Sequence, residues 1–261
     1  MKFPTAPDAR FARDQLITGC ETMKHHLAAL ARADGKATRG IHTVRKFGKS
    51  LRGGFSLFGL KHSAAVEIQS IGRILAQSRD AASHLTAWKK LAWNDDPEIA
   101  RTISSLLEQQ KQAATIPPPP EVIAWCSARV ATAESEIRQI PEDALTKRAK
   151  SGIKRLAGKI TTCCATLDRN HPESFHEARK ALKAWTGAIS LFPHGRINPD
   201  PHLDDLLVTL GRENDLRTLA EWLRKHGFTP HFSPSLWTAL SKKQRKIQKH
   251  LCKRLQTLKI T

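Results

Sequence analysis

Apolar residues recur every three or four positions along most of the chain, which is the spacing of one face of an α-helix. Runs that alternate β-branched with polar residues, as strands do, are scarce. The pattern therefore predicts an all-α fold. Helices are expected near residues 8–33, 38–59, 62–92, 96–114, 120–139, 142–168, 173–192, 201–226 and 234–258.

Four consecutive prolines interrupt this pattern in the stretch TIPPPPEV, from Thr115 to Val122. Prolines in series cannot continue a helix, and they favour a stiff, extended spacer. We therefore interpret residues 1–261 as a single domain made of two helical repeats. The first half is residues 1–115, the proline-rich linker is residues 116–120, and the second half is residues 121–261.

Each half contains one copy of a repeated stretch. IHTVRKFGKSLRGGFSLF, from Ile41 to Phe58, aligns without gaps with FHEARKALKAWTGAISLF, from Phe175 to Phe192, and the two share eight of eighteen residues. Further on, Asp80 matches Asp215, and a tryptophan follows in each half. Such a duplication predicts two tandem four-helix bundles that are related by a pseudo-two-fold axis.

The repeated stretch forms a two-sided helix in both halves. Residues three, four and seven apart share a helix face, and in each copy this spacing selects a row of cations opposite an apolar face. Solvated faces usually mix charges of both signs, because opposite charges at this spacing attract each other. The two rows have no carboxylate among them, and they consist of His42, Arg45, Lys46, Lys49 and Arg52 in the first copy and His176, Arg179, Lys180 and Lys183 in the second.

Two further helices carry cationic stripes opposite apolar ones. If the apolar stripes close the bundle cores, the cationic stripes of both halves line a shared central groove that would bind an extended polyanion. The alternative is that each stripe is an ordinary solvated face. The two stripes are Lys147, Lys150 and Lys154 in the first of these helices, and Lys242, Arg245, Lys246, Lys249 and Lys253 in the C-terminal one.

The composition supports a polyanionic partner. The chain has 43 Lys and Arg against 24 Asp and Glu, a net charge of +19, and an excess of this size is typical of proteins that bind nucleic acid, anionic membranes or other phosphate-rich partners. Tyrosine is absent and aromatic residues are only 6% of the chain, which is thin for a surface that stacks bases. No apolar run is long enough to span a membrane or to act as a signal peptide. The five cysteines are expected to be reduced, so we expect a cytoplasmic protein that does not act on membranes.

The motifs HTVRKFGKSLR and HEARKALKAWT, with the downstream elements LAQSRDA and LGRENDL, resemble the CHAD family, the conserved histidine α-helical domain. The resemblance covers nearly the whole chain, and it implies helical bundles with a basic central surface that binds inorganic polyphosphate. Some members of that family associate with polyphosphate granules, so the resemblance also implies a location there. It marks the two cationic rows as binding residues, with Arg79 and Arg212 as weaker candidates. The ExExK signature of a fused CYTH triphosphatase domain is missing, so we expect a stand-alone domain.

The repeats depart from each other within the motif. Thr186 stands where the first copy has Arg52, and Asn214 stands where it has Arg79. Unequal contributions from the two halves are therefore expected.

We expect a binding protein and no enzyme. Hydrolysis of phosphoanhydrides normally needs carboxylates that hold Mg²⁺, and the cationic faces have none. Asp80 and Asp215 are expected to be structural partners of nearby arginines, and a cationic surround disfavours His42 and His176 as metal ligands. No cofactor and no metal are expected. The alternative function is non-specific nucleic-acid binding, which the charge fits but which lacks a recognised reading motif.

Overall fold

The computed structural model describes residues 4–32, 37–113, 117–192 and 202–258, without the side chains of residues 37, 38 and 77–79. Within these ranges the chain forms ten α-helices and no strand, so the predicted all-α class is confirmed. Eight of the expected helices are present within a few residues of their predicted bounds. The helices are α1 (Ala6–Ala31), α2 (Ala37–Leu57), α3 (Ala64–Ile74), α4 (Ala76–Leu91), α5 (Pro97–Ala113), α6 (Pro120–Arg138), α7 (Glu142–Ala165), α8 (Glu173–Ile189), α9 (Leu203–Lys225) and α10 (Pro234–Gln256).

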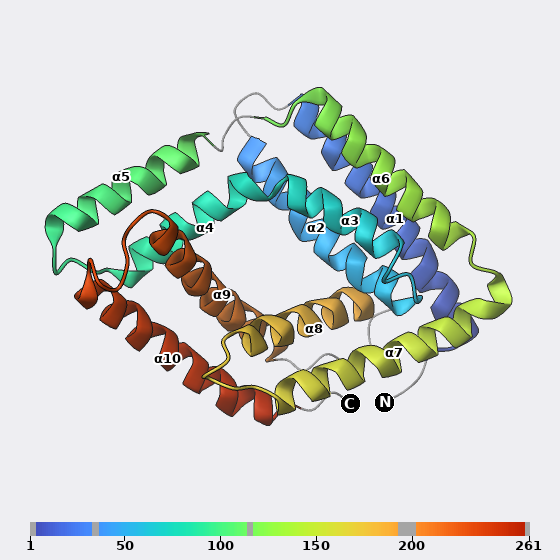
Figure 1. Cartoon of the computed structure of the whole chain (residues 1–261). Helices are drawn as coiled ribbons and strands as arrows, with labels where there is room; N and C mark the ends of the chain where they lie inside the picture. Colours follow the sequence, from blue (N-terminus) through green and yellow to red (C-terminus); the bar gives the residue numbers. More distant parts are fainter. Residues whose placement is uncertain (1–3, 33–36, 114–116, 193–201, 259–261) are drawn as a thin grey trace.

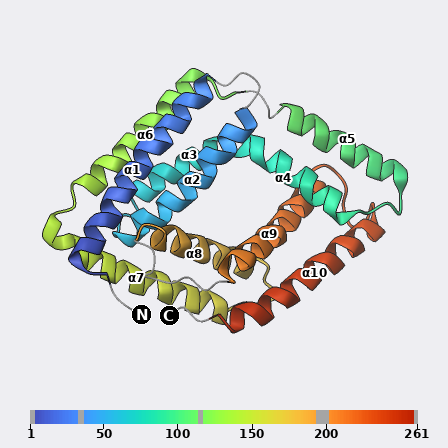
Figure 2. The ribbon, with the colours of Figure 1, turned by 180° about the vertical axis from the view of Figure 1, so that it is seen from behind.

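The helices form a four-sided frame around a central group (Figure 1). α1 and α6 lie side by side along one edge, and α7, α10 and α5 occupy the others. α2, α3, α4, α8 and α9 lie inside this frame, and the reverse view shows the same arrangement (Figure 2). The two helices with the repeated stretch, α2 and α8, are therefore central elements, and they pack against each other.

The contact between α2 and α8 is reciprocal. A Cβ on Gly53 would lie 2.4 Å from the carbonyl oxygen of Ala184, and a Cβ on Gly187 would lie 2.6 Å from the carbonyl oxygen of Ser50. Gly53 and Gly187 hold the same position in the repeat, and so do Ser50 and Ala184. Each helix thus presents the same glycine to the same position of its partner, as a two-fold axis requires. This contact fits the predicted pseudo-two-fold relation and explains why the repeat keeps that glycine.

Two hydrophobic clusters hold the helices together, and each one draws side chains from both halves of the chain. The larger cluster joins α1, α2, α3, α6, α7 and α8 to parts of α9 and α10, and it includes the fully buried Phe55 and Phe175. The smaller cluster joins α4 and α5 to the remaining parts of α9 and α10, and it includes Trp88 and Trp222. The repeat is therefore a repeat of helices, whereas the hydrophobic cores are shared between the halves.

The helix expected over residues 62–92 is wrong in one respect, because it is broken at Leu75 into α3 and α4. A continuous helix would use the carbonyl of Gly72 to accept the amide four residues later. Here that carbonyl instead accepts a hydrogen bond from Arg45 Nη1 on α2, at 2.6 Å. A side chain that enters the hydrogen-bond ladder next to a glycine is a common cause of a helix break.

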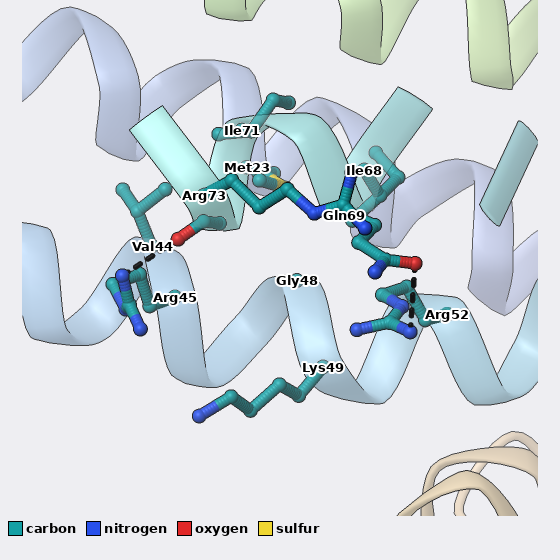
Figure 3. A pocket seen from close by; sticks show the side chains of 11 residues that line it. Met23, Val44, Arg45, Gly48, Lys49, Arg52, Ile68, Gln69, Ile71 and Arg73 are labelled. Carbon is teal, nitrogen blue, oxygen red and sulfur yellow. Dashed lines mark hydrogen bonds between the residues drawn. The ribbon is translucent and has the colours of Figure 1, made fainter. Parts of the chain in front are cut away.

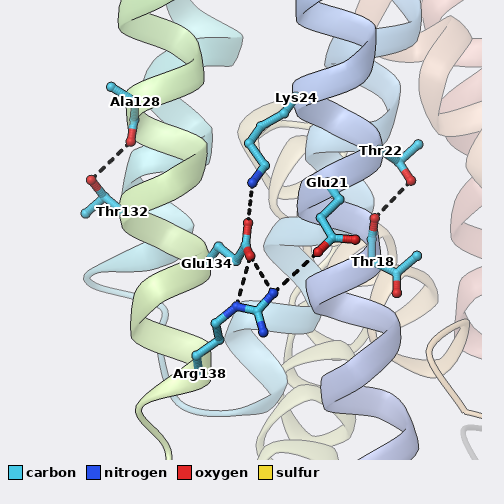
Figure 4. Close-up of polar contacts among 8 residues, drawn as sticks. All are labelled: Thr18, Glu21, Thr22, Lys24, Ala128, Thr132, Glu134 and Arg138. Atoms are coloured by element: carbon cyan, nitrogen blue, oxygen red, sulfur yellow. Dashed lines mark hydrogen bonds and ion pairs between the residues drawn. The ribbon is translucent and has the colours of Figure 1, made fainter.

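Helix α6 follows the prolines and brings the chain back onto the first half, where it packs against α1 and α3. Lys24 Nζ on α1 lies 2.8 Å from the Glu134 carboxylate on α6, and Arg138 donates to the same carboxylate at 2.7 Å and to Glu21 at 3.4 Å (Figure 4). Burial would raise the pKa of Glu134, but the hydrogen bonds from Lys24 and Arg138 outweigh it and lower the pKa. The contacts of Glu134 with Lys24 and of Arg138 with Glu21 therefore stabilise the packing of α6 against α1.

Candidate functional site: a cationic cleft between α2 and α3

The two-sided character predicted for the first repeated helix is present in α2. Val44, Leu51 and Phe55 are buried in the larger cluster, and the cations occupy the other side of the helix. The row is not uniformly open to solvent, because its members differ in burial. His42 and Lys46 are exposed, Lys49 and Arg52 are half-buried, and the Arg45 side chain is only 10% exposed.

Arg45 connects α2 to both α3 and α4. Its Nη1 donates to the carbonyl oxygen of Gly72 at the end of α3, and its Nη2 lies 3.9 Å from Asp80 Oδ1 on α4. The contact matches the structural role expected for Asp80, which is to hold a neighbouring arginine. Arg45 therefore stabilises the helix break in addition to contributing charge.

A cleft of about 170 Å³ lies between α2 and α3, and we call it the α2–α3 cleft (Figure 3). Four cations from the two helices line it, above a floor of glycine and aliphatic side chains. Its lining, within the described residues, has no carboxylate and no aromatic ring. The cleft is lined by Met23, Val44, Arg45, Gly48, Lys49, Arg52, Ile68, Gln69, Ile71, Gly72 and Arg73.

Two arginines dominate the electrostatics of the α2–α3 cleft. Arg52 Nη2 donates to the neutral Gln69 side chain at 3.1 Å, and Arg73 extends along α3 toward the same side of the cleft (Figure 3). Burial lowers the pKa of Arg52, and the positive charge of Arg73 lowers it further. Within the described residues neither arginine pairs with a carboxylate. An anion between them would replace this repulsion with two charge-assisted contacts.

Arg73 and Gln69 were not among the residues predicted from the sequence. Both residues lie on α3, which packs against α2 and has no row of cations in its sequence. A signal exists, because the two residues are four apart and so share a face of α3. That face could be assigned to the site only once α3 was known to pack against α2.

The histidine of the second repeat has a protein partner. His176 Nδ1 on α8 lies 3.0 Å from Asn214 Oδ1 on α9, and the same oxygen lies 3.4 Å from Arg217 Nη2. Because an amide oxygen only accepts, His176 donates from Nδ1. Asn214, which departs from the arginine of the first repeat, thus positions the histidine and links α8 to α9.

The other cations of the second repeat differ in their environments. Arg179, which corresponds to Arg45, is buried at 9% exposure, and Lys183 is half-buried. Lys180 is exposed and forms an ion pair with Glu177 of the preceding turn. Arg212 on α9 is exposed. Arg79 lies on α4, but its side chain is outside the described part of the structure.

The stripes of α7 and α10 are exposed, and none of their residues is among those that line the α2–α3 cleft. The α7 lysines line a shallow groove that also contains Asp143, and Lys242 and Arg245 line another groove beside Trp237. Two arginines of α7, Arg148 and Arg155, donate to carbonyl oxygens at the end of α2 and so hold α7 against it. A single groove shared by all the stripes remains a prediction. The exposed residues concerned are Lys147, Lys150, Lys154, Lys242, Arg245, Lys246, Lys249 and Lys253.

The two recurrent aspartates lie near one half-buried histidine where α4 packs against α9. The ring of His84 lies 6.3 Å from the ring of Trp222, measured between centroids. Burial lowers the pKa of His84, and this effect exceeds the opposing one of the carboxylates Asp80, Asp215 and Glu221. The neighbourhood of these aspartates is therefore part of the packing between the repeats.

Comparisons with known proteins bear on the fold and the family. No helix in the described ranges is long and apolar enough to cross a membrane. No curated protein matches the chain significantly. Among solved structures, PptA from Streptomyces chartreusis has a similar fold, with a TM-score of 0.55 and 12% sequence identity over 94% of this chain and 97% of that one. The model of the CHAD domain matches residues 19–224, a segment that includes both histidine helices and the cleft. The chain therefore belongs to the CHAD domain family.

Proposed function

We propose that the protein binds inorganic polyphosphate through the cationic faces of its helices, with the α2–α3 cleft as part of the binding surface. The observation that carries this proposal is that Arg45, Lys49, Arg52 and Arg73 all line one cleft, whose described lining has no carboxylate. Asp80 lies beside Arg45, but the charge of Arg73 still lowers the pKa of Arg52. Repulsion between like charges costs stability, and a polyanionic ligand offsets that cost. Family membership supports the same ligand.

The chemistry of the cleft fits a phosphate chain better than a nucleic acid. Guanidinium groups donate two parallel hydrogen bonds to phosphate oxygens, and an ammonium group acts as a point charge. Proteins that bind single-stranded nucleic acid without sequence preference also stack bases on aromatic side chains. The described lining of the cleft offers charge and no ring for stacking.

We also propose that binding is not accompanied by hydrolysis, and that the protein locates to polyphosphate granules through this binding. The support is the lack of a carboxylate in the described cleft lining, since phosphoanhydride hydrolysis normally uses carboxylate-bound Mg²⁺. Incubation of the pure protein with polyphosphate and Mg²⁺ should release no orthophosphate. Steady release that depends on the protein would overturn this part of the proposal.

The binding proposal is tested by titration of long-chain polyphosphate into the wild type and into Lys49→Gln and Arg52→Gln. These half-buried residues are chosen over Arg45 and Arg179, whose burial makes their removal a test of folding. Each variant should weaken binding about ten-fold, the size expected for one lost charge-assisted contact, and should lower the slope of log K against log salt by about 0.7.

Arg101→Gln is the matched control. It removes one positive charge from the exposed face of α5, where Arg101 lines a shallow groove with Glu98. Its affinity should stay within about two-fold of the wild type, because a remote exposed charge is largely screened at physiological salt. Equal losses in the cleft variants and in the control would show that net charge alone drives binding.

A further inference from the structure

The two repeats are chemically unequal where the first one forms its cleft. The matched pair Arg45/Arg179 sets the residue correspondence between α2 and α8. The matched pair Asp80/Asp215 sets the correspondence between α9 and the segment of α3 and α4. Burial supports this register, because the buried Ile68, Ile71 and Leu75 correspond to the buried Leu203, Leu206 and Leu210. Two of the partly buried cations of the α2 row are the same in α8, where Arg179 matches Arg45 and Lys183 matches Lys49.

The glycines that keep the cleft open are replaced in the second repeat. Gly48 corresponds to Leu182, which is fully buried, and Gly72 corresponds to Leu207, which packs against the larger cluster. A Cβ on Gly72 would meet no atom within 4 Å, so this residue borders open space. In the second repeat, leucine side chains stand at both positions where the first repeat has none.

The cleft's charges are replaced as well. Arg52 corresponds to Thr186, whose hydroxyl donates to the carbonyl of Lys183 within α8. Arg73 corresponds to Val208, which is 53% exposed. The neutral Gln69, which accepts from Arg52, corresponds to the exposed Asp204. The second repeat therefore lacks the facing arginine pair and has an acidic residue near the corresponding place.

From these replacements we infer that the protein has one strong subsite for a short phosphate segment, located in the α2–α3 cleft of the first repeat, and that the second repeat contributes only weaker, surface contacts to a longer chain. The inference rests on the proposed function and deepens it. A long polyphosphate would be held at the cleft by Arg52 and Arg73 and would extend from there across the central helices. Such a subsite is small enough to be occupied by a short phosphate chain alone.

The probe is inorganic tripolyphosphate, titrated calorimetrically at physiological salt, with long-chain polyphosphate measured in parallel. We expect one tripolyphosphate per chain. Arg52→Thr and Arg73→Val introduce the second repeat's own residues, and each should weaken tripolyphosphate binding about ten-fold or more. Lys183→Ala in the second repeat should change it less than about three-fold, because Lys183 is not among the residues that line the α2–α3 cleft and a charge outside the cleft is partly screened at physiological salt.

Gly72→Leu separates the shape of the cleft from its charge. The substitution introduces the leucine of the second repeat, leaves the net charge unchanged and faces open space, so the helical circular dichroism signal should be kept. It should abolish tight tripolyphosphate binding. Should either Gly72→Leu or Arg73→Val fail to fold, the other one decides, because they test the same cleft independently.

The outcomes are distinguishable. One site that is lost in the first-repeat variants and kept in Lys183→Ala supports the inference. Two equal tripolyphosphate sites would overturn the inference, and so would equal losses of affinity from Arg73→Val and Lys183→Ala. The proposed function would still stand in either case if the wild type binds long-chain polyphosphate. If long-chain polyphosphate itself fails to bind the wild type, the proposed function fails, and the subsite with it.

Discussion

The crossing of α2 and α8 makes a sharp prediction about stability. A Cβ on Gly53 would lie 2.4 Å from the Ala184 carbonyl oxygen and 2.9 Å from the Ala188 nitrogen, which are both backbone atoms of α8. Ordinary contacts of a Cβ begin at 3.4 Å, so the axes of the two helices would have to separate locally by about 1 Å. Backbone atoms in the middle of a helix cannot rotate away as a side chain does.

Gly53→Ala should therefore destabilise the protein in spite of the better helix propensity of alanine. Overpacking a tight contact costs about 1–3 kcal/mol, and replacing a helical glycine by alanine returns about 0.5–1 kcal/mol. The midpoints of these two ranges leave a net loss of about 1 kcal/mol, with an upper bound of about 2.5 kcal/mol. Gly187→Ala should cost a similar amount, since it meets the Ser50 backbone in the reciprocal way. The double variant should cost less than the sum of the two, because one separation of the helices relieves both clashes.

Urea unfolding followed by circular dichroism measures these differences. Gly158→Ala is the control, because Gly158 lies in α7 and a Cβ there would meet no atom within 4 Å. That variant should gain about 0.5–1 kcal/mol. The reasoning is refuted if Gly53→Ala shifts the urea midpoint upward as Gly158→Ala does.

Two further predictions concern pH and thiol chemistry. The pKa of Glu134 in the folded protein is below its ordinary value of 4.5, so its contribution to stability is complete above pH 4.5 and is lost as the pH falls through the folded pKa. Glu134→Gln should thus cost about 1–2 kcal/mol at neutral pH and progressively less in acid, and an undiminished cost in urea unfolding at low pH would contradict the role assigned to the Lys24–Glu134–Arg138 contacts. Burial raises the pKa of Cys20 to about 12 and that of Cys126 to about 11, so both should react with a thiol reagent far more slowly in the native protein at pH 8 than in denaturant. Rapid native modification of both cysteines would show that the larger cluster is more open than described.

Much of the architecture was accessible from the sequence because helical periodicity and internal repetition are local signals. The apolar stripe of α2 predicted its buried face, and the match between Gly53 and Gly187 was visible as one of the shared residues of the repeat. The all-α class and most helix bounds followed from the same pattern. What the repeated glycine does could be seen only once the two helices were known to cross there.

The remainder depended on which helices pack together. The break at Leu75 arises because Arg45, from a different helix, takes the carbonyl of Gly72, and no pattern within residues 62–92 records that contact. Arg73 belongs to the cleft only because α3 faces α2. The near-burial of Arg45 likewise follows from its position between α2, α3 and α4, whereas helical spacing alone placed it in a row of equivalent cations.

A competition titration tests the central claim most directly. Long-chain polyphosphate and single-stranded DNA of matched total charge are titrated against the wild-type protein at physiological salt. A cleft that recognises phosphate without stacking bases should bind polyphosphate at least about ten-fold more tightly than the DNA, and polyphosphate should displace DNA that is already bound. Equal affinities for the two polyanions would contradict the account, because the protein would then respond to charge alone.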